Sequence, residues 1–188
     1  MALTDPLAWI DLEMTGLNPA SDVIVEIAVI LTDGQLTKTI EGPELVIAAS
    51  PDALARMAPI VRTMHTESGL LALIGDSTIS VADAEQSVVD FLISNIGDGQ
   101  DVLLAGNSVH TDRSFVHAHM PTLDEYLHYR HLDVSTLKEI ARRWHPKALE
   151  TAPRKSGGHR ALADIRESIE ELRHYRRTLF VEIAQEPQ

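Results

Sequence analysis

Cysteine is absent from the 188 residues of the chain. A disulfide framework, a zinc–thiolate site and a thiol nucleophile are therefore excluded. Long apolar runs are also lacking, because no stretch approaches the roughly 20 apolar residues that a membrane-spanning helix needs. The first residues, Met1–Pro6, have neither the basic nor the apolar region of a secretory signal. We expect a cytoplasmic protein with no membrane partner.

Positive charge is scarce. The chain has 16 Lys and Arg against 28 Asp and Glu, for a formal net charge of −12. A chain this acidic is not expected to bind long duplex nucleic acid through many phosphate contacts. It leaves room for a small anionic substrate held by metal ions and a few local cations. A hydrophobic content of 44% is ordinary for a globular protein, and the length predicts one domain over residues 1–188.

The hydrophobic pattern predicts an α/β fold. Strands are expected first at Leu7–Asp11, Val23–Thr32 and Leu36–Ile47, as an antiparallel meander, and later at Val102–Ala105 and His131–Asp133. This order predicts a central mixed five-stranded sheet flanked by helices. The expected helices are Pro51–Met57, a helix capped at Ser80 that runs to about Asn95, Thr111–His119, Val134–Trp144 and Arg160–Ile183.

Two further expectations concern the same pattern. The segment Lys147–Gly158 has the composition of a loop. Both tryptophans, Trp9 and Trp144, occupy positions that are expected in the core.

Asp11 and Glu13 are two residues apart at the end of the first predicted strand. Side chains at i and i+2 of a strand point to the same face. Two carboxylates on one face of a core strand repel each other and resist desolvation. A divalent cation such as Mg²⁺ or Mn²⁺ would resolve this conflict. The alternative is a strand that has already emerged into a solvated loop.

Three further residues could join this pair. Asp112 lies near the start of a predicted helix, and Asp164 lies in the first turns of the last helix. Helix N-termini favour acidic residues electrostatically, which is a sufficient explanation for either one alone. His159 precedes Asp164 by five residues, roughly 140° along a regular helix. The two can therefore point alike only if His159 precedes the regular helix, freed by Gly157-Gly158.

In order and spacing, these five residues resemble the DEDDh exonucleases of the ribonuclease H-like superfamily. Longer blocks of sequence resemble the oligoribonuclease family, and Met14 favours it because proofreading relatives usually carry Thr there. The resemblance covers roughly residues 7 to 180 and leaves a short acidic C-terminal tail, whose order stays open. The blocks are Asp11–Pro19, Val25–Ala28, Gly106–Ser108, Tyr129–Glu139 and His159–Leu162.

The resemblance implies 3′-to-5′ hydrolysis of very short oligoribonucleotides to 5′-mononucleotides. Chiefly dinucleotides would be cut, including linear products such as pGpG, with two Mg²⁺ or Mn²⁺ ions. By resemblance, Asp11 bridges both ions, and Glu13 and Asp164 complete the site on the nucleophile side. Asp112 serves the leaving-group side, and His159 is the general base.

The resemblance also implies a set of substrate-binding residues. Leu17 would wedge between the two bases, although a loop leucine folded onto the core is the alternative. His65 would lie near the scissile nucleotide; taken alone, it would be an ordinary surface or capping histidine. Ser108, Arg130 and Ser135 would cap the 5′ phosphate of the substrate, with Tyr129 reaching in from the partner subunit of a homodimer.

Some questions stay open at this level. Ile60 stands near the position where the family often has a Trp, so base affinity could differ. Glu26, within an apolar strand, could support the site or form a structural ion pair. Rival functions are an exonuclease acting on longer RNA or DNA ends, a catalytically silent nucleotide-binding module, and an interaction domain with incidental acids. The Met14 and Tyr129–Ser135 features argue against the first rival, and the complete set of five residues argues against the others.

Overall fold

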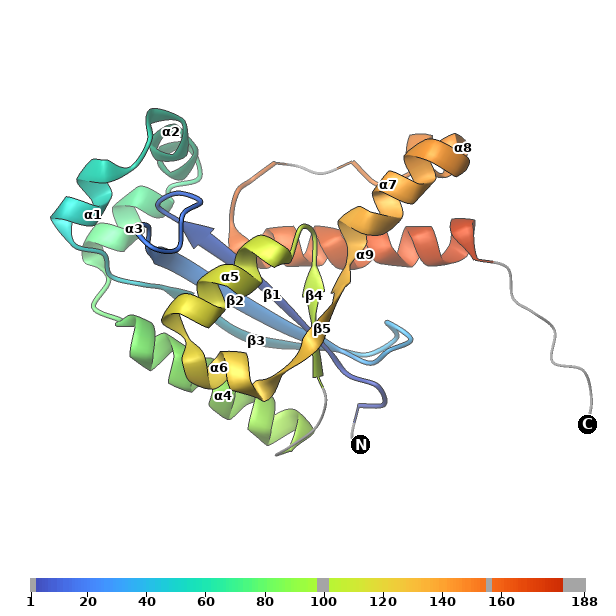
Figure 1. Ribbon diagram of the computed structural model, residues 1–188, viewed down its shortest axis with the longest axis horizontal. Helices are drawn as coiled ribbons and strands as arrows, with labels where there is room; N and C mark the ends of the chain where they lie inside the picture. Colours follow the sequence, from blue (N-terminus) through green and yellow to red (C-terminus); the bar gives the residue numbers. More distant parts are fainter. Residues whose placement is uncertain (1–2, 98–101, 155–156, 181–188) are drawn as a thin grey trace, which may run out of the picture.

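A mixed five-stranded sheet organises the computed structural model, which describes residues 3–97, 102–154 and 157–180 (Figure 1). The strand order is β3-β2-β1-β4-β5. The first three strands form an antiparallel meander, and β4 and β5 continue the sheet in parallel with β1. The predicted sheet is therefore confirmed. Its strands are β1 (Leu7–Met14), β2 (Ile24–Thr32), β3 (Thr39–Val46), β4 (Val102–Gly106) and β5 (Leu127–Asp133).

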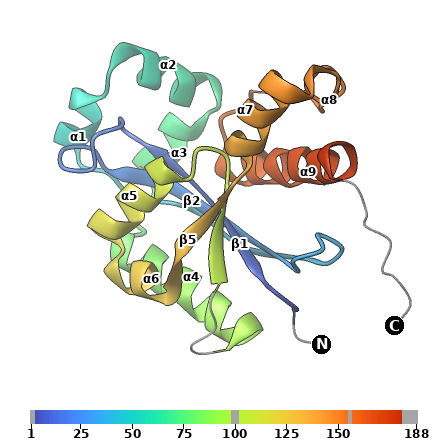
Figure 2. The ribbon, with the colours of Figure 1, turned by 45° about the vertical axis from the view of Figure 1, so that its right-hand side comes forward.

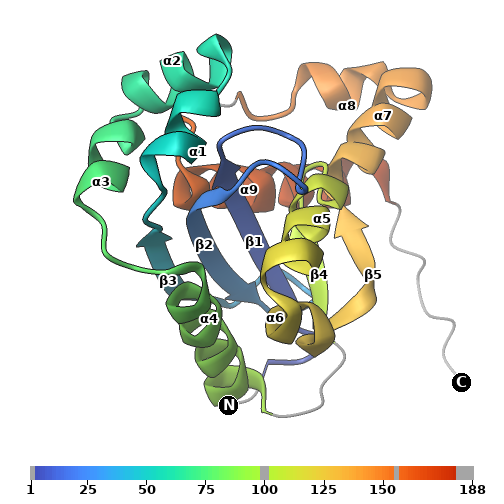
Figure 3. The same cartoon turned by 60° about the vertical axis from the view of Figure 1, so that its left-hand side comes forward.

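Helices cover both faces of the sheet (Figures 1 and 3). Helices α4, α5 and α6 pack on one face, and α7 and α9 pack on the other. Helices α7 and α8 lie beside α9, on the side of the molecule away from α1, α2 and α3 (Figure 2). The helices are α1 (Pro51–Arg56), α2 (Pro59–Glu67), α3 (Leu70–Asp76), α4 (Val81–Ile96), α5 (His110–His119), α6 (Pro121–Tyr126), α7 (Val134–Trp144), α8 (Pro146–Glu150) and α9 (Ala161–Leu179).

Strand β1 divides its side chains between two cores. Ile10 and Leu12 pack with α4, α5 and α6, whereas Leu7 and Trp9 pack with α7 and α9. Because side chains alternate along a strand, the residues that follow Trp9 at steps of two also face α9. Asp11 and Glu13, beyond the apolar part of the strand, therefore point to the face of the sheet that α9 covers.

Local signals set several helix starts. The Ser80 hydroxyl accepts a hydrogen bond from the Asp83 backbone N–H at 3.1 Å, and Asp83 accepts one back from the Ser80 N–H at 3.2 Å. This capping box confirms the predicted start of α4. The Ser50 hydroxyl accepts from the Ala53 N–H at 3.2 Å at the start of α1, where Pro51 follows.

Helix α9 begins without a side-chain cap of its own. Glu26, fully buried on β2, supplies the missing acceptor from outside the helix. One of its oxygens accepts from the Arg160 guanidinium at 2.9 Å and 2.7 Å, and the other accepts from the Ala161 N–H at 3.1 Å. The structural ion pair left open by the sequence is thus present, and it ties the start of α9 to the middle of the sheet.

Several sequence expectations were wrong. Trp9 is fully buried, but Trp144, the last residue of α7, is 70% exposed. The segment expected as a loop after residue 146 begins with the short helix α8, and α2, α3 and α6 are helices that the pattern did not predict. Helix α9 ends at Leu179, short of its predicted end, and the tail 181–188 lies outside the described residues. Within the described ranges, none of the helices combines the length and apolar character needed to cross a bilayer.

The Glu26 ion pair yields a stability prediction. Glu26→Gln turns an amide toward the Ala161 N–H and leaves the Arg160 guanidinium without its buried counter-charge. Breaking a buried pair from one side costs about 3–5 kcal/mol, so the free energy of unfolding in urea should fall by about that amount. The matched control is Glu41→Gln, which removes the Arg166 pair between side chains that are 53% and 55% exposed. It should cost less than about 1 kcal/mol. Equal losses in the two variants would contradict this role of Glu26.

Candidate active site

The five residues predicted to form a catalytic cluster come from three elements that meet at the end of β1. Asp11 and Glu13 lie on β1, Asp112 lies on α5, and Asp164 lies in the first turn of α9. His159 lies outside these elements, two residues before α9 begins at Ala161. Figures 1 and 3 show the arrowhead of β1 beside the start of this helix.

Glu13, His159 and Asp164 form a tight group. One potential ligand atom from each lies within 4.8 Å of the others. His159 has a backbone φ of +47°, and the regular helix begins only at Ala161. The condition under which His159 and Asp164 could point alike, that the histidine precede the helix, is therefore met. A left-handed conformation at a residue other than glycine is costly and persists where surrounding contacts enforce it.

Asp112 reaches the same strand from α5. It is 7% exposed, and its Oδ1 accepts a hydrogen bond from the Leu12 backbone N–H at 3.1 Å. Leu12 stands between Asp11 and Glu13, so this carboxylate approaches the strand at the centre of the acidic pair. Burial raises the pKa of Asp112 from its ordinary 3.8 to about 7, although the Leu12 N–H opposes that change.

The carboxylates at this strand end are electrostatically crowded. Burial raises the pKa of Glu13 from its ordinary 4.5 to about 7, and the nearby charges of Asp164, Glu26 and Asp112 add to the increase. The Arg160 guanidinium acts in the opposite direction. Carboxylate oxygens and an imidazole that converge in a partly desolvated place suit a divalent cation such as Mg²⁺ or Mn²⁺. The donor set thus fits a metal site.

His65 lies behind the acidic group rather than at the surface. It is 1% exposed, and its Nε2–H donates to the Met14 carbonyl at 2.8 Å. Its Nδ1 lies 3.8 Å from a Glu13 carboxylate oxygen. The alternative of an ordinary surface or capping histidine is therefore wrong, because this ring holds the end of β1 from within helix α2.

Leu17 extends from the loop that follows β1. Its side chain is 78% exposed, so the alternative of a leucine folded onto the core is wrong. The loop is closed at its base by Asp22, which accepts hydrogen bonds from the Asn18 N–H at 2.9 Å and the Thr15 hydroxyl at 3.3 Å. Ile60, on α2, is also exposed, at 69%.

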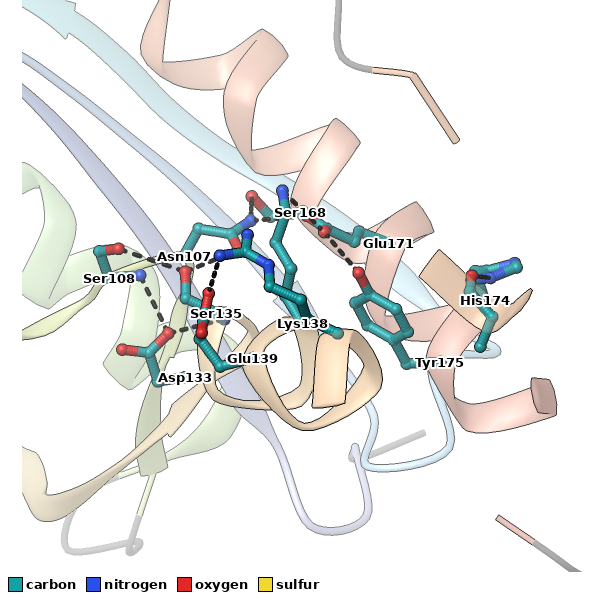
Figure 4. Close-up of polar contacts among 12 residues, drawn as sticks. Asn107, Ser108, Asp133, Ser135, Lys138, Glu139, Ser168, Glu171, His174 and Tyr175 are labelled. Atoms are coloured by element: carbon teal, nitrogen blue, oxygen red, sulfur yellow. Dashed lines mark hydrogen bonds and ion pairs between the residues drawn. The ribbon is translucent and has the colours of Figure 1, made fainter. Parts of the chain in front are cut away.

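Ser108 and Ser135 come together through Asp133 (Figure 4). The same Asp133 oxygen accepts from the Ser108 N–H at 2.9 Å and the Ser135 N–H at 2.8 Å. The two hydroxyl oxygens consequently lie 3.2 Å apart, and Ser108 has a left-handed φ of +55°. Because the Ser135 hydroxyl donates to Asn107, the exposed Ser108 hydroxyl is the one of this pair that can donate to an anionic oxygen.

Tyr129 and Arg130 lie on β5, the strand that ends at Asp133. Tyr129 is 67% exposed, and the Arg130 guanidinium carbon is 4.9 Å from the centre of its ring. This stacking is of the cation–π type. The structure thus brings Ser108 and Ser135 into contact and presents Tyr129 and Arg130 as a neighbouring exposed pair.

Sequence reasoning gave no role to Asn107 and left that of Glu26 open. Glu26 holds the start of α9, and Asn107 binds Ser135 from behind. A signal for Glu26 was its place in an otherwise apolar strand. Nothing in the local sequence of Asn107 indicated its contacts with α9, which begins more than fifty residues later in the chain.

Known proteins with similar sequences point to one family. The RNase_T family, described as Exonuclease, matches residues 8–172. An oligoribonuclease of Rhodococcus jostii (strain RHA1) is 49% identical over 179 residues, which cover 95% of this chain and 90% of the relative. Oligoribonucleases of Mycobacterium sp. (strain KMS) and Streptomyces coelicolor are 48% and 49% identical, with 83% and 89% of the relative covered.

Solved structures support the fold. An Exonuclease I from Methylocaldum szegediense is 18% identical with a TM-score of 0.64, and the match covers 92% of this chain and 40% of that one. E. coli Exonuclease I in complex with a dT13 oligonucleotide is 15% identical with a TM-score of 0.64, covering 93% of this chain and 41% of that one. This chain thus spans about two fifths of the length of these structural neighbours, and at such low identity the likeness shows a shared ribonuclease H-like fold. With the sequence relatives at almost half identity over nearly their whole lengths, the chain belongs to the oligoribonuclease family of DEDDh exonucleases.

Proposed function

We propose that this protein is a 3′-to-5′ exoribonuclease that hydrolyses very short oligoribonucleotides, chiefly dinucleotides, to 5′-mononucleotides. Linear products such as pGpG are within this substrate class. The observation that carries the proposal is the meeting of Glu13, His159 and Asp164 within 4.8 Å, in a chain of this family. The net charge of −12 agrees with a substrate too short to need a long basic groove. We assign the activity to a single cytoplasmic exonuclease domain over residues 1–188.

Four carboxylates are proposed to hold two divalent cations, Mg²⁺ or Mn²⁺. Asp11 would serve both ions, Glu13 and Asp164 would serve the side of the attacking water, and Asp112 would serve the side of the leaving oxygen. When bound, such a pair supplies positive charge to the attacking and leaving oxygens of a phosphodiester. The crowding that raises the pKa of Glu13 and of Asp112 supports this assignment, because cations would offset it.

His159 is proposed to take the proton from the attacking water. Its exposed imidazole lies beside Glu13 and Asp164, and its unusual backbone conformation puts it there. The next two residues, Arg160 and Ala161, are bound to Glu26. The base is thus carried on a short segment fixed at its C-terminal side, which limits the geometries it can adopt.

The substrate is proposed to lie between the acidic group and the paired serines. Leu17 would wedge between the two bases, which its 78% exposure permits. His65 would act near the scissile nucleotide through the end of β1. The terminal 5′ phosphate would be capped by Ser108, Ser135 and Arg130, with hydroxyl and guanidinium donors that suit its oxygens. In a homodimer, Tyr129 of each chain would extend into the site of its partner.

Substrate length tests the proposal. Hydrolysis of 5′-labelled RNA from two to about twenty nucleotides should be fastest for dinucleotides, with Mg²⁺ or Mn²⁺ present, because a capped phosphate leaves no room for further nucleotides. The control Asp112→Ala removes one proposed metal ligand and should abolish the cleavage. Equal or faster cutting of long RNA would contradict the cap and favour an exonuclease for longer ends. Absence of cleavage with either metal would favour a nucleotide-binding module.

The assignment of His159 predicts a separation of turnover from binding. His159→Ala removes the proton acceptor and should lower kcat by about 10²- to 10⁴-fold, the usual contribution of a general base. The affinity for a dinucleotide should change much less, since none of the proposed phosphate contacts is lost. His117→Ala is the matched control, because this side chain is 78% exposed on α5 and pairs with Asp124. Loss of dinucleotide binding in His159→Ala would count against the role of base.

The carboxylate cluster also predicts how the stability of the metal-free protein changes with pH. Folding raises the pKa of Asp112 and of Glu13, so in metal-free protein their contribution to stability is complete below about pH 4. It is lost as the pH rises through about 7, because the unfolded chain releases these protons first. Asp112→Asn should therefore stabilise metal-free protein increasingly between pH 4 and 8, on the order of 1–3 kcal/mol at the upper end.

Urea unfolding at several pH values checks this prediction. Saturating Mn²⁺ should stabilise the unsubstituted chain at pH 8 and have a smaller effect on Asp112→Asn. Asp90→Asn, on the exposed side of α4, is the control and should show no such trend with pH. A stabilisation by Asp112→Asn that is the same at every pH would contradict the assigned direction.

A further inference from the structure

A line of hydrogen bonds runs from the paired serines into the protein (Figure 4). The Ser135 hydroxyl donates to Asn107 Oδ1 at 3.1 Å. The Asn107 amide donates in turn to Ser168 Oγ at 2.8 Å and to Glu171 Oε2 at 3.2 Å, both on α9. Ser168 then donates to the backbone carbonyl of Asp164 at 2.8 Å. A surface hydroxyl pair is thereby joined to the helix that carries a proposed metal ligand.

The direction of these bonds follows from chemistry. An ionised Glu171 can only accept, so the Asn107 side chain must turn its NH₂ group toward it. Its oxygen then faces Ser135, which must donate its single proton to it and can only accept from the neighbouring Ser108 hydroxyl. The Ser108 proton is therefore the one that can turn from Ser135 to a phosphate oxygen. The hydrogen-bond partners of Asn107 therefore decide which end of its amide is the nitrogen and which is the oxygen.

Burial increases along the same line. Ser108 is exposed and Ser135 half-buried, whereas Ser168 and Glu171 are 4% and 3% exposed. Glu171 also accepts from the Tyr175 hydroxyl at 3.1 Å and lies 3.5 Å from the Lys138 ammonium. A ligand can reach the outer hydroxyls, while the inner residues are held by donors from α7 and α9. Such an arrangement orients the outer groups without touching the ligand.

We propose that Asn107 is a positioning residue that sets the preference for a terminal 5′ phosphate. It acts through Ser135, whose Oγ it holds beside that of Ser108, and Glu171 fixes the orientation of its amide. This inference rests on the proposed dinucleotide hydrolysis and deepens it, because it names the residues that make the phosphate end of the site selective. Asp133 holds the backbone N–H groups of both serines, whereas Asn107 binds the Ser135 hydroxyl, so the backbone and the side chain of Ser135 are fixed by different residues.

The test compares two substrates on the same enzyme preparation. The ratio of kcat/KM for a 5′-phosphorylated dinucleotide to that for the same dinucleotide with a 5′-hydroxyl measures phosphate selectivity, and loss of folded protein cancels from it. Asn107→Ala should lower this ratio about tenfold, mostly through KM, as expected for disturbing a hydrogen bond to a charged group. Asn95→Ala is the matched control, because Asn95 binds only the Phe91 carbonyl among the described contacts and lies on α4.

A double-mutant cycle shows whether Asn107 acts through Ser135. Ser135→Ala should lower the ratio by a similar factor, and the double variant should lower it no further. Independent, multiplying losses would overturn the proposed route. A ratio that is unchanged in Asn107→Ala would overturn the inference altogether.

Glu171 provides a second pair of variants should Asn107→Ala not fold. Glu171→Leu removes the acceptor that orients Asn107 and should lower the same ratio, whereas Glu171→Gln retains an acceptor and should preserve it. Equal ratios in these two variants would overturn the inference. The unsubstituted protein distinguishes a failure of the proposed function from a failure of this inference. If it hydrolyses neither dinucleotide, the proposed function is contradicted. If it hydrolyses both with a kcat/KM ratio near one, the phosphate cap and this inference are contradicted together. A high ratio that survives Asn107→Ala contradicts the inference alone.

Discussion

The rest of the site depends on one buried carboxylate. Glu26 is fully enclosed in the sheet, and an enclosed charge requires partners that satisfy both of its oxygens. Those partners are Arg160 and the backbone N–H of Ala161, so the start of α9 is pinned to β2. His159 immediately precedes the pinned residues and Asp164 follows one turn later. The positions of both are thereby set by a contact that neither of them makes.

A second constraint comes from the like charges gathered around β1. Glu13, Asp112 and Asp164 are brought near one another by three elements, and Glu26 adds a further negative charge from β2. Arg160 offsets part of this charge, but the pKa of Glu13 remains raised to about 7. An arrangement that costs stability without cations and suits them when they are present is a common property of functional sites. Folding supplies the rigidity that holds the charges together.

Helix α9 connects the two ends of the proposed substrate site. Its first turn presents Asp164 to the acidic group, and Ser168 and Glu171, one to two turns later, bind Asn107. Both ends also use a residue with a left-handed backbone, His159 at one and Ser108 at the other. In each case a buried or half-buried carboxylate, Glu26 or Asp133, accepts hydrogen bonds from the adjacent backbone. At both ends, therefore, a carboxylate that binds backbone N–H groups accompanies a residue with a left-handed backbone.

Much of this could be predicted from the sequence, because the relevant signals were local. Alternating apolar residues predicted β1, and a run of β-branched residues predicted β2. The Ser80–Asp83 spacing predicted the start of α4, and the i, i+2 spacing of Asp11 and Glu13 placed them on one face. Only the tertiary structure decided that His65 is buried behind Glu13, that Leu17 is exposed, and that Trp144 lies outside the core. It alone also joined Glu26 to Arg160 and Asn107 to Glu171, pairs that are 134 and 64 residues apart. Local sequence determines which face of a strand or helix a side chain occupies, whereas the partner across a sheet or helix is set by how distant elements pack.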